Sequence, residues 1–169
     1  NTTGAHNCAF GYGALDGNTT AAHNVAVGFD ALGGAVTGSS NTAVGNYCLD
    51  ANTSASYSTA LGYQALTAVT EGAGNTGIGT FAGDVITTGT YNTCIGYASD
   101  PSAVGSTNQI VIGVAIAGTA NYQVSIGSTN NVTRNLFAVD NAWTQSSDVR
   151  KKKNIEDAVL GLDFVNDLR

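Results

Sequence analysis

Histidine and aspartate are the side chains of this chain whose spacing bears most directly on metal binding. His6 and His23 are seventeen residues apart, and Asp16, Asp50 and Asp84 follow one another at intervals of thirty-four residues. Imidazole nitrogens bind zinc and other transition metals, and carboxylate oxygens bind Ca²⁺. The way in which the intervening elements stack decides whether either set can meet at one ion.

Three cysteines and one basic cluster are the other reactive groups. Cys8, Cys48 and Cys94 form no CxxC pair and no disulfide framework, so we expect three small buried residues. Arg150 and Lys151–Lys153 form a run of cations, which by itself is typical of a solvated charge cluster. A lysine amine acts as a base only when desolvation or neighbouring positive charge lowers its pKa, and this run supplies such charge.

A repeat of seventeen residues organises most of the chain. Glycines recur at this interval at Gly11, Gly28, Gly45, Gly62, Gly79, Gly96 and Gly113. An apolar residue precedes each of these glycines, and the residue one step earlier is mostly small. The consensus is Asn-Thr-Ala-Val-Gly-x-x-Ala-Leu, followed by eight residues rich in Thr, Ser, Gly and Asn. An eighth, shortened copy has its glycine at Gly127, fourteen residues after Gly113.

The length of the repeat predicts the fold. Seventeen residues are too few for a pair of helices and fit one turn of a β-solenoid. Alternating small and large side chains suit a short strand with two different faces, and the glycine permits the positive φ needed to turn a corner. We therefore expect an all-β solenoid of about seven coils over residues 1–127. Each coil has few large apolar side chains, so we expect neighbouring coils, caps or oligomerisation to stabilise it.

Stacked coils bear on the candidate metal ligands. Tyr57 and Tyr91 hold the register of the two histidines in later coils, which favours a surface ladder over a metal site. The three aspartates belong to alternate coils, roughly 10 Å apart, which is too far for them to bind one Ca²⁺ together. We expect no metal and no cofactor.

Two further columns of residues belong to the repeat. One holds Thr42, Thr59, Thr76 and Thr93, and a single threonine column falls short of the paired columns that a flat ice-binding array needs. The other follows the glycine and holds Tyr12, Phe29, Tyr63 and Tyr97. Packing between coils or chains is the favoured role of these rings, and a glycan-binding surface is the alternative.

The period stops after Gly127. Residues 135–139 alternate like a strand, and from Ile155 the apolar residues recur with a period close to 3.5 at Val159, Leu162, Val165 and Leu168. That spacing predicts a short amphipathic helix with Asn154 as its N-cap, suited to a contact of three helices at a fibre axis. We divide the chain into the solenoid (1–127), a connecting strand segment (128–146) and the start of a C-terminal domain (147–169).

Composition excludes several classes of function. The formal net charge is −6 and no Lys or Arg precedes Arg134, so the repeats lack the basic surface that nucleic-acid binding needs. The chain contains no run of about 18 apolar residues, so the sequence predicts no membrane span. The chain has no methionine and begins at Asn1, so we expect it to be a segment of a longer protein.

The repeats have a family resemblance. Asn41–Gly45 and Ser58–Leu66 resemble the repeats of phage tail-fibre proteins and, more loosely, the head repeats of trimeric autotransporter adhesins. The resemblance covers about residues 5–113 and implies a homotrimeric fibre of β-rolls. It implies a structural, host-contacting shaft or tip of a virion tail fibre, with other tail or fibre proteins and a host-surface glycan or receptor as partners. A trimeric adhesin of the bacterial cell surface is the alternative.

The C-terminal segment has a second resemblance. Ser147–Ile155, Ser-Asp-Val-Arg-Lys-Lys-Lys-Asn-Ile, is similar to the opening of the intramolecular chaperone domain of tail spikes and fibres, the S74 peptidase family. By that resemblance Ser147 is the nucleophile, Lys152 is its base, and the bond between Ser146 and Ser147 is cut. The implied chaperone drives trimerisation and is then released. A single-turnover serine–lysine autoprotease with no external substrate is the remaining alternative for the main activity.

Overall fold

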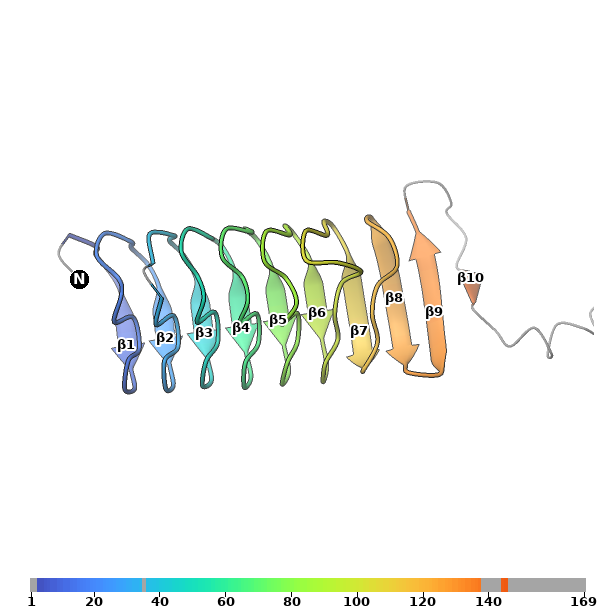
Figure 1. Ribbon diagram of the computed structural model, residues 1–169, viewed down its shortest axis with the longest axis horizontal. Helices are drawn as coiled ribbons and strands as arrows, with labels where there is room; N and C mark the ends of the chain where they lie inside the picture. The colour runs from blue at the N-terminus through green and yellow to red at the C-terminus, as the bar shows by residue number, and fades with distance from the viewer. Residues whose placement is uncertain (1–2, 35, 138–143, 146–169) are drawn as a thin grey trace, which may run out of the picture.

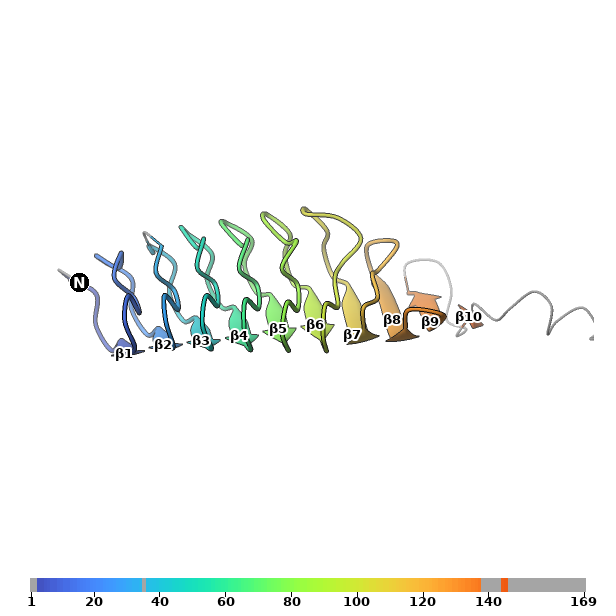
Figure 2. The ribbon, with the colours of Figure 1, turned by 60° about the horizontal axis from the view of Figure 1, so that its bottom comes forward.

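The chain forms a stack of β-coils. The computed structural model describes residues 3–34, 36–137 and 144–145. One short strand from each coil lies beside the strand of the next, so the strands follow one another along the stack in sequence order (Figure 1). The segments that return from each strand form the remaining sides of the coils, as Figure 2 shows. The predicted all-β solenoid of about seven coils is confirmed.

Ten strands form one sheet in the order β1 to β10. Strands β1 to β8 are parallel, and up to β7 each residue pairs with the residue seventeen positions later, as Ala43 does with Ala60. The strands are β1 (Cys8–Phe10), β2 (Val25–Val27), β3 (Thr42–Val44), β4 (Thr59–Leu61), β5 (Thr76–Ile78), β6 (Thr93–Ile95), β7 (Ile110–Val114), β8 (Gln123–Ser128), β9 (Asn131–Leu136) and β10 (Thr144–Gln145).

The glycine that follows each of strands β1 to β6 turns the corner of the coil. We call these residues, together with Gly113 in β7 and Gly127 in β8 at the same repeat position, the corner glycines. Gly62 has a φ of 132° and Gly79 a φ of 124°, a region that L-residues rarely adopt. A Cβ on Gly62 would lie 2.7 Å from the carbonyl carbon of Gly79. The coils therefore approach too closely at this corner for a side chain, and the predicted positive φ is confirmed.

Small residues and leucines fill the interior of the coils. The residue two positions before the corner glycine points inward, and Ala43 and Ala60 are completely buried. Leu32, Leu49 and Leu66, four positions after the corner glycine, are also completely buried. These leucines have φ between 51° and 53°, a left-handed conformation that costs an L-residue about 1–2 kcal/mol. Burial of a leucine side chain contributes about 1.5–3 kcal/mol, which offsets that strain.

The asparagines of the repeat form a ladder inside the stack. Asn75 is completely buried; its Oδ1 accepts a hydrogen bond from the N–H of Asn92 at 3.0 Å, and its Nδ2 donates to the carbonyl of Gly89 at 2.7 Å. The same two bonds to the next coil recur at Asn24, Asn41 and Asn92. Each asparagine satisfies one backbone donor and one backbone acceptor where the coil is irregular, which is what burial of such groups requires.

The last strands reverse direction. After the shortened repeat, Gly127 of β8 pairs with Gly113 of β7. Strand β9 is antiparallel to β8, and β10 is antiparallel to β9. The strand predicted at 135–139 is wrong in its bounds, because pairing with β8 begins β9 at Asn131 and ends it at Leu136. The helix predicted from Ile155 falls outside the described residues, within which no helix is present.

Candidate functional site

The outward side of the parallel strands is the most extensive candidate surface, and we call it the outer sheet face. It consists of the side chains one and three positions before the corner glycines. The nearer column is apolar in every coil: Phe10, Val27, Val44, Leu61, Ile78, Ile95, Ile112 and Ile126. The farther column holds Cys8, Val25, Thr42, Thr59, Thr76, Thr93, Ile110 and Val124. The single threonine column seen in the sequence is thus one of two columns on this face.

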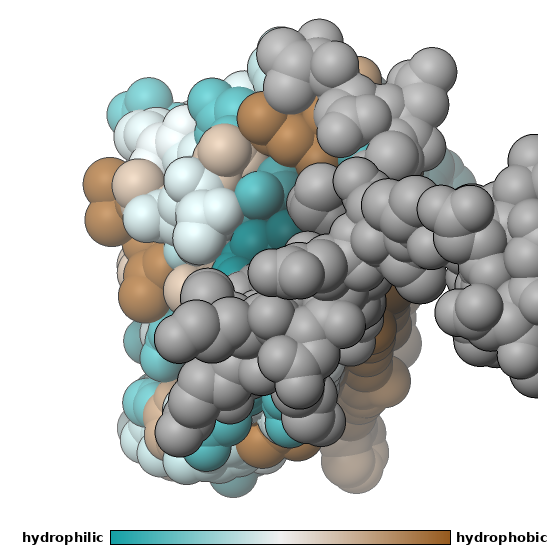
Figure 3. Space-filling view, turned by 90° about the vertical axis from the view of Figure 1, so that its right-hand side faces the viewer, coloured by the Kyte–Doolittle hydropathy of each residue, from teal (hydrophilic) through white to brown (hydrophobic). Residues whose placement is uncertain are grey.

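Most of this face is exposed or half-buried although it is largely apolar, and Val124 of β8 is its buried member. Leu61 is 47% exposed and Ile78 is 36% exposed, whereas Ala60 and Gly77, the inward residues of the same two strands, are buried. No Asp, Glu, Lys or Arg occurs in either column. Viewed along the stack from its C-terminal end, hydrophobic residues recede along the lower right, where the outer sheet face lies (Figure 3). Large contiguous apolar surfaces on proteins are typical of interaction sites, which makes this face a candidate for one.

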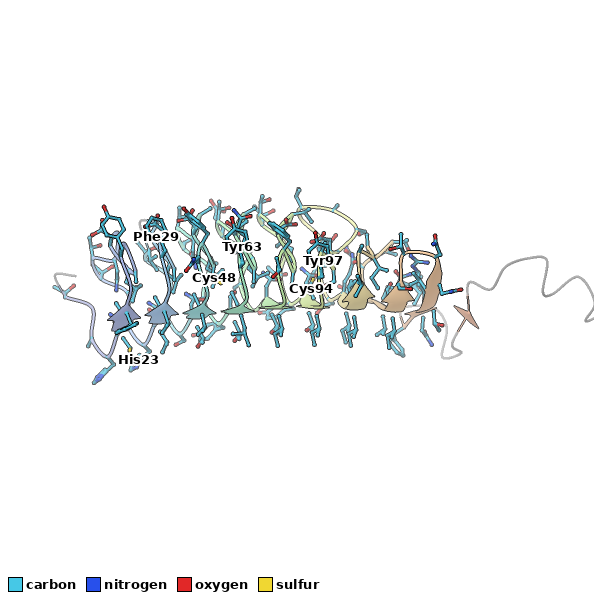
Figure 4. All side chains as sticks on the ribbon, turned by 90° about the horizontal axis from the view of Figure 1, so that it is seen from below. His23, Phe29, Cys48, Tyr63, Cys94 and Tyr97 are labelled. Carbon is cyan, nitrogen blue, oxygen red and sulfur yellow. The ribbon has the colours of Figure 1, made fainter. Side chains whose placement is uncertain are left out.

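An aromatic ladder follows the corner glycines on another edge of the stack. Neighbouring rings have centroids 5.3–6.1 Å apart along the series Tyr12, Phe29, Tyr47, Tyr63, Phe81 and Tyr97. Figure 4 shows Phe29, Tyr63 and Tyr97 on this edge, with His23 on the opposite side of the strands. Tyr47 and Phe81 are one position out of register with the other four, so the repeat alone did not reveal them. Because each ring contacts the next, the predicted packing between coils is confirmed.

The two histidines stack on each other. Their ring centroids are 4.9 Å apart and their planes differ by 13°. Both residues have left-handed backbones, with φ of 58° and 60°, as do Tyr57 and Tyr91 at the same position in later coils. All four side chains are exposed, which confirms the predicted surface position. Within the described residues no group of three or more His, Cys, Asp or Glu side chains gathers where it could hold a metal ion.

The cysteines differ in their surroundings. Cys48 and Cys94 are completely buried, as predicted, whereas Cys8 is exposed. The prediction is wrong for Cys8 because its position belongs to the outer sheet face. The thiol of Cys48 donates to the carbonyl of Gly62 at 2.6 Å, and burial raises the pKa of Cys94 to about 12. Both buried residues therefore remain thiols at neutral pH.

Two pairs of acidic side chains lie close together. Burial, and then the charge of Asp30, raises the pKa of Asp50. Burial, and then the charge of Asp84, raises the pKa of Asp100 to about 7. The acidic neighbour of Asp50 is therefore Asp30, and that of Asp84 is Asp100. Neither neighbour shares the repeat position of Asp50 and Asp84.

The predicted catalytic pair lies outside the described residues. Ser147, Lys152 and the bond between Ser146 and Ser147 all belong to the segment 146–169. Their assignment as nucleophile, base and cleavage site stays a prediction from the resemblance of Ser147–Ile155.

Comparisons with known proteins add no assignment. No protein-family model, no curated protein and no solved structure matches this chain. Among the described residues, no helix has the length and apolar character to cross a membrane.

Proposed function

We propose that this chain is a structural segment of a homotrimeric fibre in which the outer sheet faces of three copies pack against one another. The observation that carries the proposal is the pair of uncharged, largely apolar columns along eight consecutive strands, of which all members but Val124 are exposed or half-buried. Burial of this face against partner chains would remove it from water, at roughly 25 cal/mol for each Å² of apolar area.

The spacing of the face favours a second copy of this chain as its partner. Successive strands are about 4.8 Å apart, so eight strands present the same pattern over about 34 Å. A partner surface complements this pattern only if it repeats with the same spacing, and the outer sheet face of an identical chain does so. The number three, rather than two, comes from the resemblance of the repeats to trimeric fibres.

The wider role in the fibre also rests on that resemblance. We propose a phage tail fibre, in which the stack serves as a host-contacting shaft or tip, and we keep a bacterial surface adhesin as the alternative. Peptides of this chain in purified virions, and not in washed bacterial envelopes, would support the tail fibre; the reverse distribution would support the adhesin. Self-cleavage between Ser146 and Ser147, by Ser147 with Lys152 as base, would then release the C-terminal chaperone.

Charge placed on the outer sheet face tests the assembly. In the double variant Leu61→Asp, Ile78→Asp, six carboxylates of a trimer would meet in a dehydrated interface, so we expect sedimentation to show monomers. The matched control is Val104→Asp, because Val104 is 54% exposed and lies outside the strands. We expect this variant to remain trimeric. A double variant that sediments like the wild-type trimer contradicts the proposed interface.

A further inference from the structure

The column of buried leucines ends before the last parallel coils. Four positions after the corner glycine, Leu66 is followed one coil later by Gly83 and then by Asp100. A Cβ on Gly83 would lie 2.7 Å from Cδ2 of Leu66 and 3.1 Å from Cδ1 of Ile86, so apolar groups occupy that space. Asp100 thus brings a carboxyl group to a position that is apolar in earlier coils. Its Oδ1 is buried and has no hydrogen-bond partner among the described residues.

A second carboxyl group faces Asp100. The carboxyl groups of Asp84 and Asp100 interact across adjacent coils, and the backbone N–H groups of Asp84 and Val85 also face the carboxyl group of Asp100. A hydrogen bond between the two carboxyl groups requires a proton on one of them. The backbone of Asp100 holds the next coil, because its N–H donates to the carbonyl of Ile116 at 2.9 Å and its carbonyl accepts from Gly118 at 2.8 Å. The carboxyl pair therefore sits where the coil of β6 joins the coil of β7.

Few other charges act on this pair. The charge of Asp100 reaches the buried thiol of Cys94, and no Lys or Arg precedes Arg134 in the chain. Arg134, in β9, donates from Nη2 to the carbonyl of Ala117 at 3.3 Å, in the coil that follows Asp100. The two histidines lie in the first two coils of the stack, five positions before Gly11 and Gly28.

We propose that Asp84 and Asp100 share one proton and act as a pH-sensitive clasp between the coils of β5, β6 and β7. With the proton in place, one carboxylic acid donates to the other carboxylate and the coils are held together. When the proton leaves to water, two carboxylates face each other in a partly buried place, and the junction between β6 and β7 loosens.

The direction of the pH effect follows from the carboxyl group of Asp100. Folding raises the pKa of Asp100 from 3.8 to about 7, first by burial and then by the charge of Asp84. The folded chain therefore binds this proton more tightly than the unfolded chain does. The resulting contribution to stability is complete below pH 3.8 and is lost as the pH rises through about 7. The clasp accordingly opens within about one pH unit of neutrality.

Thermal unfolding as a function of pH tests the clasp in the 169-residue chain. We expect the wild type to melt about 5 °C higher at pH 5.5 than at pH 8.5, a shift that allows for the partial exposure of Asp100. Asp100→Asn keeps the size of the side chain but cannot ionise, so we expect most of the difference to vanish. The control is Asp16→Asn, an exposed residue at the position of Asp84 in its own coil, which should keep the wild-type difference. His6 and His23 are present in all three proteins and do not affect the comparison.

Two local measurements separate the clasp from a general effect of pH. In the wild type, we expect the amides of Asp100 and Gly118 to lose protection from hydrogen exchange above pH 7, after correction for the intrinsic rate; in Asp100→Asn they should not. The carboxyl carbon of Asp100 should titrate near pH 7 by NMR, and this measurement on the wild type stands even if the variant fails to fold. A titration midpoint below pH 5, or an unchanged pH dependence in Asp100→Asn, overturns the proposal.

Discussion

Removal of one rung of the asparagine ladder should destabilise the whole stack. Asn75→Ala deletes an amide that is completely buried and that makes four hydrogen bonds. The N–H of Asn92 loses its acceptor, and the carbonyls of Gly72 and Gly89 lose the Nδ2 donor. All three of these backbone groups belong to buried residues.

The magnitude follows from those three groups. A buried donor or acceptor left without a partner costs about 1–3 kcal/mol, and an orphaned carbonyl is tolerated better than an orphaned N–H. Water that enters the space left by the amide recovers part of the loss. We therefore expect Asn75→Ala to lower the free energy of unfolding by about 3–5 kcal/mol for each chain, which corresponds to a fall in melting temperature of about 10–15 °C.

Two companion variants make the comparison specific. Ser58 takes the place of asparagine one coil earlier, where its Oγ accepts from the N–H of Asn75 at 3.3 Å. Asn75→Ser should therefore keep an acceptor for the N–H of Asn92 and lose about half as much stability as Asn75→Ala. Asn46→Ala removes an exposed hydrogen bond to the N–H of Phe29, so water replaces it and the change should stay within about 0.5 kcal/mol. Melting curves followed by circular dichroism measure all three, and an Asn75→Ala variant that melts within 2 °C of the wild type would refute the ladder.

Three further predictions concern the corner, the interior and the C-terminal motif. Gly62→Ala should lower the free energy of unfolding by at least about 2 kcal/mol, because its Cβ would meet the backbone of Gly79 and its φ is 132°. The control is Gly105→Ala, where the nearest atom to the added Cβ is 3.5 Å away, and chemical denaturation should show almost no change for it. Leu66→Ala should lower the free energy of unfolding by about 2–4 kcal/mol through the cavity that it leaves, and a loss under 1 kcal/mol would argue against a packed leucine column. In the full-length protein, intact mass should show a product ending at Ser146 for the wild type and an uncut chain for Ser147→Ala; cleavage that persists in Lys152→Ala contradicts the assigned base.

The repetitive part of the fold could be predicted because one local requirement recurs in every coil. A corner with positive φ and a close backbone approach accepts only glycine, so the coils appear in the sequence as glycines seventeen residues apart. The inward alanines and outward valines alternate with the strand period, which revealed two faces without indicating which one is buried. The structure shows that the alanines are buried and that the larger apolar side chains before the corner glycines lie on the outer side.

The remaining features depend on neighbouring coils or oppose local preference. Leu32, Leu49 and Leu66 have left-handed backbones, which local propensity disfavours and only packing of the coil compensates. The recurrence of asparagine was visible in the sequence, but its hydrogen-bond partners lie in the next coil. Cys8 was expected to be buried because cysteine usually is, and its place on the outer sheet face decides otherwise.

The site was less predictable than the fold because it is a surface rather than a motif. The aromatic ladder includes Tyr47 and Phe81, which belong to a different repeat position from Tyr63 and become neighbours only through stacking. Asp100 likewise meets Asp84 from an adjacent coil and at a different repeat position, so no count of aspartate spacings reveals the pair.

The native mass of the 169-residue chain tests the central claim, burial of the outer sheet face between copies, most directly. Each chain has a mass of 17.0 kDa, so native mass spectrometry or light scattering should give about 51 kDa at micromolar concentration, with no monomer in excess. A mass of 17.0 kDa that persists as the concentration rises would show that the outer sheet face stays in water, and would contradict the trimeric fibre.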